Sequence, residues 1–570
     1  MDQETFERLS QEEQERVFHQ TPFRERGELL VYSHNPARLT QSLTQEELYL
    51  LTREMDLEER SEVLRYASLP QLFFISDIDC WKKDRLRPQG FREWLETLLE
   101  ADEERLLAWL VEMDYETVVT GFKGLIRVLK PEWEYPSDEL LGDQPTFTLD
   151  ERYFISVKEE NLETVRRSIE ILFENTRGRY AAILEGILGE MDYELEEEAF
   201  QKRAIRLAER GFPDPETARH IYSPLTREEF ERFPRKAGKG QEPGREIPFD
   251  GKPPRYLTLW SGDRLFLDEV LLLFREEPHE IREGLEEELA WLSNKVIACE
   301  GVDFASEERV RRGIERARRF VSLGLESLSR RDLSRARQMM KERWLEAIFR
   351  WGVSELFSLR DSACEVLDHY WKGDQKIFLD FLNDPYEGIF RGLLEWIPEC
   401  FDPEVREDPG RLRDFKDLRD LERARSTALQ IRRIHEVLEA TSPELFHRLN
   451  IEVRRDDSEM SLFSLLGSTF VHFVLKGQVS TVPLAEREVR RFLEQGFEGD
   501  GPQKVLSPTE KEKFLNRLLS DKDQELLRPL WALVFQRLEE EWGGSDPSRG
   551  IDPRFATSLY LALRRKAAQV

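Results

Sequence analysis

Apolar residues recur at helical spacing along most of the chain, most clearly between Thr44 and Tyr135. From Phe91 to Leu99 they stand at i, i+3, i+4, i+7 and i+8, so they share one face of a helix. The next clear stripe runs from Tyr115 to Leu129 and predicts a helix over those residues. Because helices of this length are marginal alone, the stretch predicts several short helices packed closely against one another.

Polar residues and glycine mark where several of these helices begin and end. Thr44 and Glu47 have the spacing of a capping box, in which each side chain accepts a hydrogen bond from a backbone amide. Asp56 stands where an N-cap is expected, and Asp214 is followed by a proline that fits the first helical turn. Gly211 suits the left-handed position that follows a helix. These residues set the predicted helix boundaries.

One stretch departs from helical spacing, near residues 145–157. Phe147 and Leu149 on one arm, and Tyr153 and Ile155 on the other, alternate with polar residues around a turn. Alternation with a period of two is typical of strands, so the stretch predicts a small β-hairpin. The sequence therefore predicts an all-α, multi-helical protein, built of irregular, solenoid-like helical stacks with one small hairpin.

The second half of the chain predicts longer helices. The segments from Asp332 to Trp351 and from Leu356 to Tyr370 are expected as two long packed helices, and residues 508–541 as two more. The longest uncharged run, Met460 to Leu475, is shorter than a bilayer span and contains several polar residues. It therefore predicts a buried core helix rather than a membrane segment.

A break in composition divides the chain into two predicted domains. Residues 235–255 carry Gly238, Gly240 and four prolines, with few apolar residues. Such a composition is typical of a flexible linker. We therefore expect an N-terminal helical domain over residues 1–234 and a C-terminal helical domain over residues 256–570.

The charge of the chain narrows the classes of partner. It contains 85 basic and 114 acidic residues, for a formal net charge of −29. This balance disfavours binding to nucleic acid and to anionic membranes, and it favours basic partners or cations. We therefore expect a protein partner, no nucleic acid and no insertion into a membrane. The sequence does not indicate an oligomeric state.

The amino terminus and the cysteines bear on the compartment. Residues 1–17 are acidic and polar and lack the apolar core of a signal peptide. The four cysteines lie far apart, and none forms a CxxC pair. A reducing cytoplasm is therefore the expected location.

No motif in the sequence identifies an activity. The chain lacks HExxH, GxSxG and the phosphate-binding GxxxxGK[ST] pattern. We assign no catalytic, cofactor-binding or metal-ligating residue and expect no cofactor. Whether the protein is an enzyme stays open, and the absence of a motif favours a non-enzymatic role.

The densest polar cluster beside apolar residues comprises Asp77, Asp79, Trp81 and Asp84. Three carboxylates within eight residues have the chemistry to bind a hard cation such as Mg²⁺ or Ca²⁺. The alternative is that the aspartates are solvated helix caps beside a packed tryptophan, which is the interpretation we favour.

A basic island stands out in this acidic chain, from Arg309 to Arg343. Arg309, Arg312, Arg316 and Arg319 lie on one side of a predicted helix. They either form a site for an anion or an acidic partner, or pair internally with acidic helices such as residues 283–288. We favour internal pairing.

Several phrases of the chain resemble a family of large uncharacterised bacterial proteins known only as a domain of unknown function. The phrases are Leu69–Phe73, Asp77–Lys82, Glu112–Tyr135, Phe147–Asp150, Arg210–Asp214, Asn294-Lys295 with Phe304, and Phe349–Gly352. This resemblance covers most of the chain and implies no known activity. The short helices from Leu48 to Leu129 also resemble, more weakly, the helical cytosolic domain of MgtE-type magnesium transporters, and a likeness of fold says little about function.

These observations lead to one functional hypothesis and two alternatives. The leading hypothesis is a non-enzymatic cytoplasmic scaffold or regulatory protein that acts by binding another protein. The alternatives are a regulator that responds to divalent cations and an enzyme whose site is assembled from distant residues. A scaffold is expected to show an exposed apolar or basic groove, a cation sensor three converging carboxylates, and an enzyme a deep pocket with perturbed titratable groups.

Overall fold

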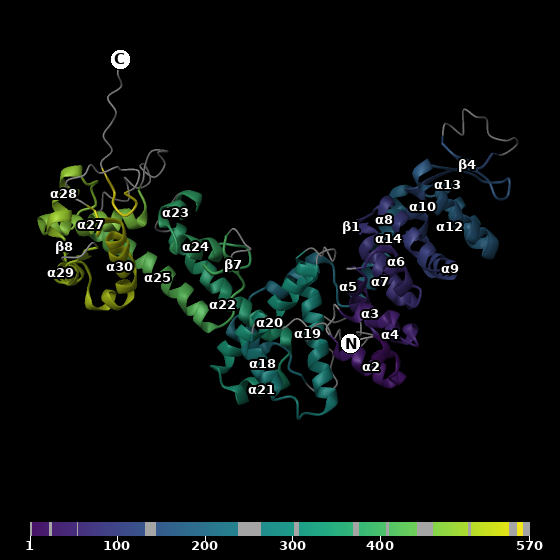
Figure 1. Ribbon diagram of the computed structural model, residues 1–570, viewed down its shortest axis with the longest axis horizontal. Helices are drawn as coiled ribbons and strands as arrows, with labels where there is room; N and C mark the ends of the chain where they lie inside the picture. The colour runs from purple at the N-terminus through teal and green to yellow at the C-terminus, as the bar shows by residue number, and fades with distance from the viewer. Residues whose placement is uncertain are drawn as a thin grey trace, which may run out of the picture. The chain divides into compact units, whose positions relative to one another are not determined.

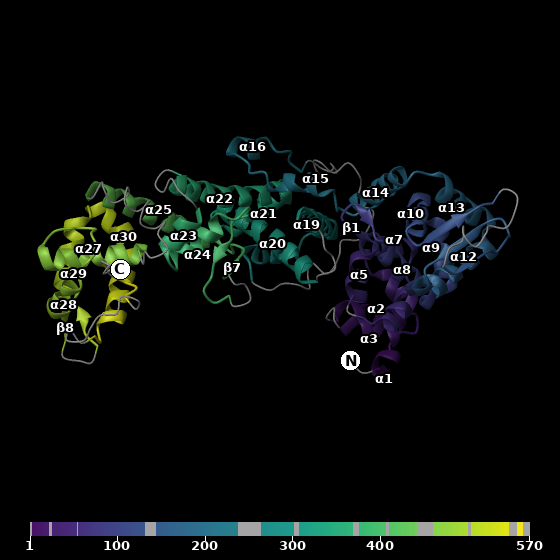
Figure 2. The same ribbon diagram turned by 90° about the horizontal axis from the view of Figure 1, so that it is seen from above.

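Helices dominate a computed structural model of the chain (Figures 1 and 2), which confirms the all-α class. The structure describes residues 3–21, 25–53, 55–131, 144–236, 264–300, 307–368, 375–405, 410–441, 460–499, 503–545 and 556–561.

The first part of the chain consists of short helices and small strands. In chain order these are α1 (Gln3–Glu7), α2 (Gln11–Gln20), α3 (Arg26–Val31), α4 (Pro36–Ser42), α5 (Gln45–Arg53), α6 (Leu57–Leu64), α7 (Leu69–Asp79), β1 (Trp81–Lys82), β2 (Arg85–Leu86), α8 (Pro88–Ala101), α9 (Glu103–Glu112), α10 (Tyr115–Lys123), β3 (Ile126–Leu129), β4 (Thr146–Phe147), β5 (Phe154–Val157), η2 (Glu159–Asn161), α12 (Leu162–Asn175), α13 (Arg177–Gly189), α14 (Asp192–Glu209), α15 (Pro215–Arg219), η3 (His220–Tyr222) and α16 (Arg227–Arg232).

The later part contains longer helices. These elements are α18 (Phe266–Leu272), α19 (His279–Cys299), α20 (Glu307–Ser329), α21 (Leu333–Glu342), α22 (Leu345–Val366), α23 (Gln375–Leu382), α24 (Tyr386–Leu393), β6 (Cys400–Phe401), β7 (Leu412–Arg413), α25 (Leu418–Thr441), α27 (Leu462–Lys476), α28 (Glu486–Gln495), β8 (Phe497–Glu498), β9 (Val505–Leu506), α29 (Pro508–Leu518) and α30 (Asp521–Trp542). The buried core helix expected near Met460 is α27, and the two helices expected over 508–541 are α29 and α30.

The helix boundaries follow the predicted caps. The amide of Glu47 donates to the Thr44 hydroxyl at 3.2 Å, and the amide of Thr44 donates to the Glu47 carboxylate at 3.0 Å. The Asp56 carboxylate accepts from the amide of Glu59 at 2.9 Å at the start of α6. Gly211 follows α14 with a φ of +84°, a left-handed conformation that glycine adopts without strain. Local capping chemistry is therefore enough to set these boundaries.

The helix predicted from Tyr115 to Leu129 is wrong in its second half. Helix α10 ends at Lys123, and residues 126–129 form strand β3, which pairs antiparallel with β5. The predicted hairpin, formed by β4 and β5, is confirmed, and β3 extends it to a three-stranded sheet in the order β3-β5-β4. Ile126 and Val128 are buried while Arg127 between them is exposed, so the segment suits one face of a sheet.

Three further antiparallel pairs occur among the described residues, beyond the single hairpin that the sequence predicts. They are β1 with β2, β6 with β7, and β8 with β9, and each strand has two residues. Their shortness leaves the fold class unchanged.

The two long helices expected between Asp332 and Tyr370 divide at a different place. Helix α21 ends at Glu342, and α22 then runs without interruption from Leu345 to Val366. Arg343 lies at the break, in extended backbone that pairs with Arg235. Its buried side chain donates to the carbonyl of Phe230 at 3.0 Å and to that of Phe233 at 3.2 Å. Pairing with residues more than a hundred positions away therefore sets this helix end.

The residue contacts divide the chain into two compact units. Unit 1 comprises residues 1–223, 228–321 and 332–350, and unit 2 comprises residues 224–227, 322–331 and 351–570. The predicted linker at 235–255 falls almost entirely outside the described residues. Residues on both sides of it belong to unit 1, and the linker itself stays a prediction.

Each unit has an aromatic centre. In unit 1 the Phe91 ring lies 5.4 Å from Phe122 and 5.9 Å from Trp109. A Cβ added to Gly121 would lie 2.4 Å from the Phe91 ring, so glycine allows α10 to approach α8 this closely. In unit 2 the Phe514 ring lies 4.8 Å from Trp531 and 5.3 Å from Phe470, which joins α27, α29 and α30.

Candidate functional site

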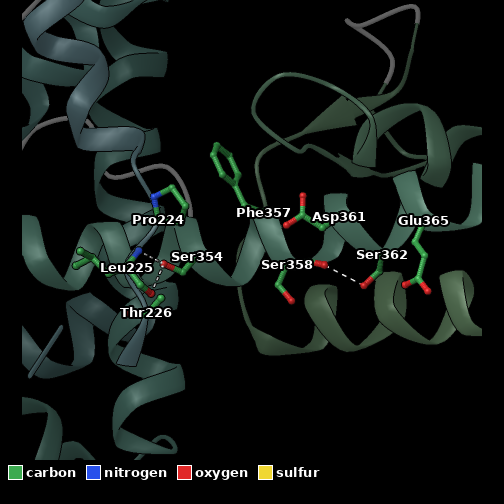
Figure 3. A pocket seen from close by; sticks show the side chains of 9 residues that line it. All are labelled: Pro224, Leu225, Thr226, Ser354, Phe357, Ser358, Asp361, Ser362 and Glu365. Carbon is green, nitrogen blue, oxygen red and sulfur yellow. Dashed lines mark hydrogen bonds between the residues drawn. The ribbon is translucent and has the colours of Figure 1, made fainter. Parts of the chain in front are cut away.

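A groove of about 420 Å³ opens along one side of α22 in unit 2 (Figure 3). We call it the α22 groove, and it is lined by Pro224, Leu225, Thr226, Ser354, Phe357, Ser358, Asp361, Ser362 and Glu365. The lining consists mostly of hydroxyl and carboxylate groups. The groove is therefore polar and acidic, and not apolar or basic as we expected for a scaffold.

The sequence of α22 explains how one helix presents this polar face. Val353, Leu356, Leu359 and Ala363 are almost fully buried and form the side of α22 that packs into the protein. The groove residues from Ser354 to Glu365 stand at i, i+3, i+4, i+7, i+8 and i+11, which places them on another side of the same helix. A helix with one apolar and one polar side exposes the polar side to solvent.

One end of the groove is lined by a non-helical segment of the chain itself, residues 224–226. The Ser354 hydroxyl accepts from the amide of Leu225 at 2.7 Å and donates to the carbonyl of the same residue at 3.0 Å. The Leu225 side chain is buried, while Pro224 and Thr226 are exposed. Figure 3 shows this segment at the Ser354 end of the helix, with Glu365 at the other end. The single hydroxyl of Ser354 on α22 therefore binds both the amide and the carbonyl of Leu225.

Beyond this segment the groove presents groups with few or no contacts of their own. The Ser358 hydroxyl makes no hydrogen bond and Asp361 makes no ion pair with any residue that the structure describes, and both side chains are exposed. Glu365 lies 3.6 Å from Arg432 of α25, and both side chains of that pair are largely exposed. Ser362 donates to the carbonyl of Ser358 at 2.9 Å. The groove thus offers a hydroxyl and a carboxylate to a ligand.

The Phe357 ring, which lines the groove, contacts an arginine. The Arg360 guanidinium lies 4.2 Å from the centre of the Phe357 ring and donates to the carbonyl of Trp396 at 2.9 Å. The Trp396 residue is 53% exposed, which is unusual for tryptophan. Exposed tryptophan beside arginine is typical of residues that dominate protein–protein binding energy.

Asp77 lies elsewhere, in unit 1, and it is buried and paired with an arginine. It stands in the last turn of α7 and is only 1% exposed. Arg206 of α14 donates to its two carboxylate oxygens at 2.6 and 2.8 Å, and Arg203 donates to its carbonyl at 2.7 Å. Burial raises the pKa of Asp77 above its usual value, and Arg206 and Arg203 limit the rise. The interpretation of Asp77 as a solvated cap is therefore wrong.

The other members of that sequence cluster point to separate partners. Asp79 pairs with Arg60 and Arg53, and the Tyr49 hydroxyl donates to it at 3.2 Å. Trp81 is packed, with the Arg203 guanidinium 5.2 Å from its ring, whereas Asp84 is exposed in the turn between β1 and β2. Within the described part of the chain, no group of three or more His, Cys, Asp or Glu is placed to hold a metal ion.

The four arginines of the basic island that were predicted on one side of a helix lie along α20 and differ in exposure. Arg316 is 5% exposed and forms an ion pair with Glu300 at 2.6 Å, and Arg319 lies 3.3 Å from Glu315. Arg309 and Arg312 are exposed. Of the acidic residues 283–288, Glu288 binds Lys236 at 2.6 Å.

Burial strongly raises the pKa values of one glutamate and of two cysteine thiols. Burial raises the pKa of Glu46 in α5 to about 7, and its Oε1 atom has no hydrogen-bond partner among the described residues. Burial likewise raises the pKa of Cys299 to about 11 and that of Cys400 to about 12, so both thiols stay protonated at neutral pH. None of these groups lines the α22 groove.

The groove residues were missed in the sequence because the predicted helices ended at Trp351 and resumed at Leu356. A continuous α22 would have exposed the signal, which is a serine at every fourth position from Ser354 to Ser362, beside two carboxylates one turn apart. That pattern places a row of hydroxyl and carboxylate groups on one side of a long helix.

The structure shows a mainly helical protein of two compact units, with a groove that contains two carboxylates in the second unit. By comparison with known families, the chain belongs to the family of unknown function DUF6178, which matches residues 3–562. No curated protein and no solved structure matches the chain. The family confirms the resemblance to large proteins of unknown function, whereas the likeness to MgtE-type transporters stays untested. Searched over its described residues, the chain has no helix long and apolar enough to cross a membrane.

Proposed function

We propose that this protein is a non-enzymatic scaffold or regulatory protein that binds another protein through the α22 groove. One observation carries the proposal. The Ser354 hydroxyl holds the amide and the carbonyl of Leu225, so α22 already binds the backbone of a short non-helical segment, one that belongs to its own chain.

The rest of the groove has the features of an unfilled part of the same site. Ser358 stands one helical turn after Ser354, and its hydroxyl has no partner among the described residues. Extended segments bind by main-chain hydrogen bonds, and neighbouring side chains supply the specificity. The exposed Trp396 and the Arg360 that holds its carbonyl add the residue types that most often anchor such contacts.

The cation-responsive alternative has less support. Asp77 and Asp79, the carboxylates that suggested it, are held by arginines from other helices. A cation would have to displace these arginines, at the cost of leaving their charges unpaired.

A reducing cytoplasm remains the location that best fits the proposal. All four cysteines, Cys80, Cys299, Cys364 and Cys400, have free thiols. Proteins of oxidising compartments typically pair their cysteines in disulfides, so unpaired thiols favour a reducing compartment.

The test is capture of partners by the tagged full chain in three forms: wild type, Ser358→Trp and Ser334→Trp. Ser358→Trp fills the groove, and Ser334→Trp makes the same change at an exposed serine of α21, in unit 1. We expect at least one protein to be captured by wild type and Ser334→Trp and to be lost with Ser358→Trp. Capture that is the same with all three forms would contradict a role for the groove.

A further inference from the structure

We infer that the occupant of the α22 groove is an extended segment of a partner protein that carries basic residues at two alternate positions. This inference rests on the proposed function and adds the chemistry of the ligand. It follows from three features of the groove: its length, the spacing of its carboxylates and the position of its unused hydroxyl.

The length of the unfilled part limits how many residues can bind. From Ser358 to Glu365 the helix rises about 10 Å, at about 1.5 Å per residue. An extended chain rises about 3.3 Å per residue, so this distance accommodates about three residues. The recognised segment is therefore short, and each of its side chains contributes a large share of the specificity.

The carboxylates are spaced to match alternate residues of such a segment. Asp361 and Glu365 stand four residues apart on α22, which is about 6 Å along the helix. Two residues of an extended chain span about 6.6 Å, and side chains two residues apart point to the same side. A segment with lysine or arginine at two alternate positions would therefore place one cation at each carboxylate.

The electrostatics favour cations at this place. Asp361 is an exposed carboxylate without an ion pair among the described residues, and the chain as a whole carries a net charge of −29. Glu365 already faces Arg432 at 3.6 Å, but that pair is 60% and 43% exposed. Exposed pairs of this kind contribute little, so a partner's cation can replace or share the contact. Asp361 is accordingly the stronger of the two subsites.

The hydroxyl of Ser358 completes the site. It stands four residues after Ser354, on the same side of α22, and has the chemistry to bind a backbone amide and carbonyl as Ser354 binds those of Leu225. The backbone of the segment would therefore lie against Ser358 while its basic side chains reach Asp361 and Glu365.

Two labelled peptides of identical composition test the spacing by fluorescence anisotropy with the full chain. The first is Gly-Pro-Lys-Leu-Lys-Thr-Gly, with lysines at alternate positions, and the second is Gly-Pro-Lys-Lys-Leu-Thr-Gly, with adjacent lysines. We expect the first peptide to bind about fivefold or more tightly than the second, because only its lysines reach both carboxylates. We expect this binding to weaken as the salt concentration rises, because both carboxylates are exposed.

Variants of the groove locate the binding. Asp361→Lys should weaken the first peptide about tenfold, whereas Asp380→Lys should leave it unchanged. Asp380 is an exposed aspartate of α23 in the same unit, with no ion pair to any described residue, so the two variants change the net charge equally. Ser358→Ala should weaken the peptide about three- to tenfold, as expected for the loss of one or two hydrogen bonds.

The outcomes separate this inference from the proposed function. Equal binding of the two peptides, no binding of the first, or no effect of Asp361→Lys would overturn the inference. The proposed function would still stand if Ser358→Trp abolishes capture of a partner in the preceding experiment. If capture is indifferent to Ser358→Trp, the proposed function fails, whatever the peptides do.

Discussion

Asp77 and Asp361 are both helical aspartates with aromatic residues nearby in the sequence, yet their surroundings in the structure differ. Asp77 is 1% exposed, and Arg206, 129 residues later in the chain, donates to both of its oxygens. Asp361 is exposed and pairs with no described residue. The sequence around Asp77 looks more like a binding site, because three aspartates crowd there. The comparison teaches that crowding of charge does not identify a binding surface, since distant residues decide which charges are already satisfied.

The largest expected effect comes from reversing the charge at the buried position. Asp77→Lys would place an ammonium group against Arg206 and Arg203 at a buried position, where solvent screens charge weakly. Breaking a buried pair costs about 3–5 kcal/mol, and we expect this reversal to lower the free energy of unfolding by about 5 kcal/mol. Asp361→Lys should change it by less than about 0.5 kcal/mol. Urea unfolding followed by circular dichroism measures both, and similar losses for the two variants would break the comparison.

The basic island extends the comparison to arginines on one helix. Arg316 forms a buried ion pair with Glu300, and Arg316→Glu would replace it by two facing carboxylates. We therefore expect Arg316→Glu to lower the free energy of unfolding by about 4 kcal/mol. Arg312→Glu, one turn earlier and exposed, should cost less than about 1 kcal/mol. The two variants carry the same charge change, so melting temperatures compared at one salt concentration distinguish them. Equal destabilisation would show that exposure does not separate these arginines.

Glu46 is a second buried acid, and its raised pKa predicts that the stability of the protein depends on pH. Its pKa is about 7 in the folded protein and about 4.5 ordinarily, so between these values the folded state binds more protons than the unfolded state. The free energy of unfolding that Glu46 contributes therefore falls as the pH rises from about 4.5 to about 7. Above pH 7 the free energy of unfolding is lower by about 3 kcal/mol, because each unit of the difference between the two pKa values is worth about 1.4 kcal/mol.

The variant Glu46→Gln carries no charge and avoids this loss. We expect it to be more stable than wild type by up to about 3 kcal/mol at pH values above 7, and equally stable near the acid end of the window. Urea unfolding of both proteins across this pH range provides the measurement. A difference that does not change with pH would mean that the pKa of Glu46 is the same in the folded and unfolded states.

The smallest effect concerns the segment that α22 already holds. Ser354→Ala removes both hydrogen bonds to Leu225 and should cost about 1–2 kcal/mol locally. Hydrogen exchange at the amide of Leu225 should accelerate by about tenfold, while Ser358→Ala should leave that amide unchanged. Unaltered exchange with Ser354→Ala would show that the segment is held by the Leu225 side chain alone.

The sequence correctly predicts those structural features that depend on residues close together in the chain. The capping box of Thr44 and Glu47, the left-handed Gly211 and the hairpin of β4 and β5 depend on residues a few positions apart. Strand β3 was mistaken for helix because its partner, β5, begins about 25 residues later. The pairing of Asp77 with Arg206 likewise required knowledge of which helices meet.

The groove shows the same limit. Six of its nine lining residues stand on one helix, but the predicted break between Trp351 and Leu356 separated Ser354 from Ser358 and hid their spacing. The contact with residues 224–226 then adds a segment that lies about 130 positions earlier in the chain.

The most direct measurement is photo-cross-linking of the full chain in its native cells, with benzoylphenylalanine in place of Ser358 or, as the control, of Ser334. We expect a discrete cross-linked protein from position 358 that is absent from position 334 and that disappears when Asp361→Lys is added. The same products from both positions, or none from position 358, would contradict the claim that the α22 groove is where this protein binds its partner.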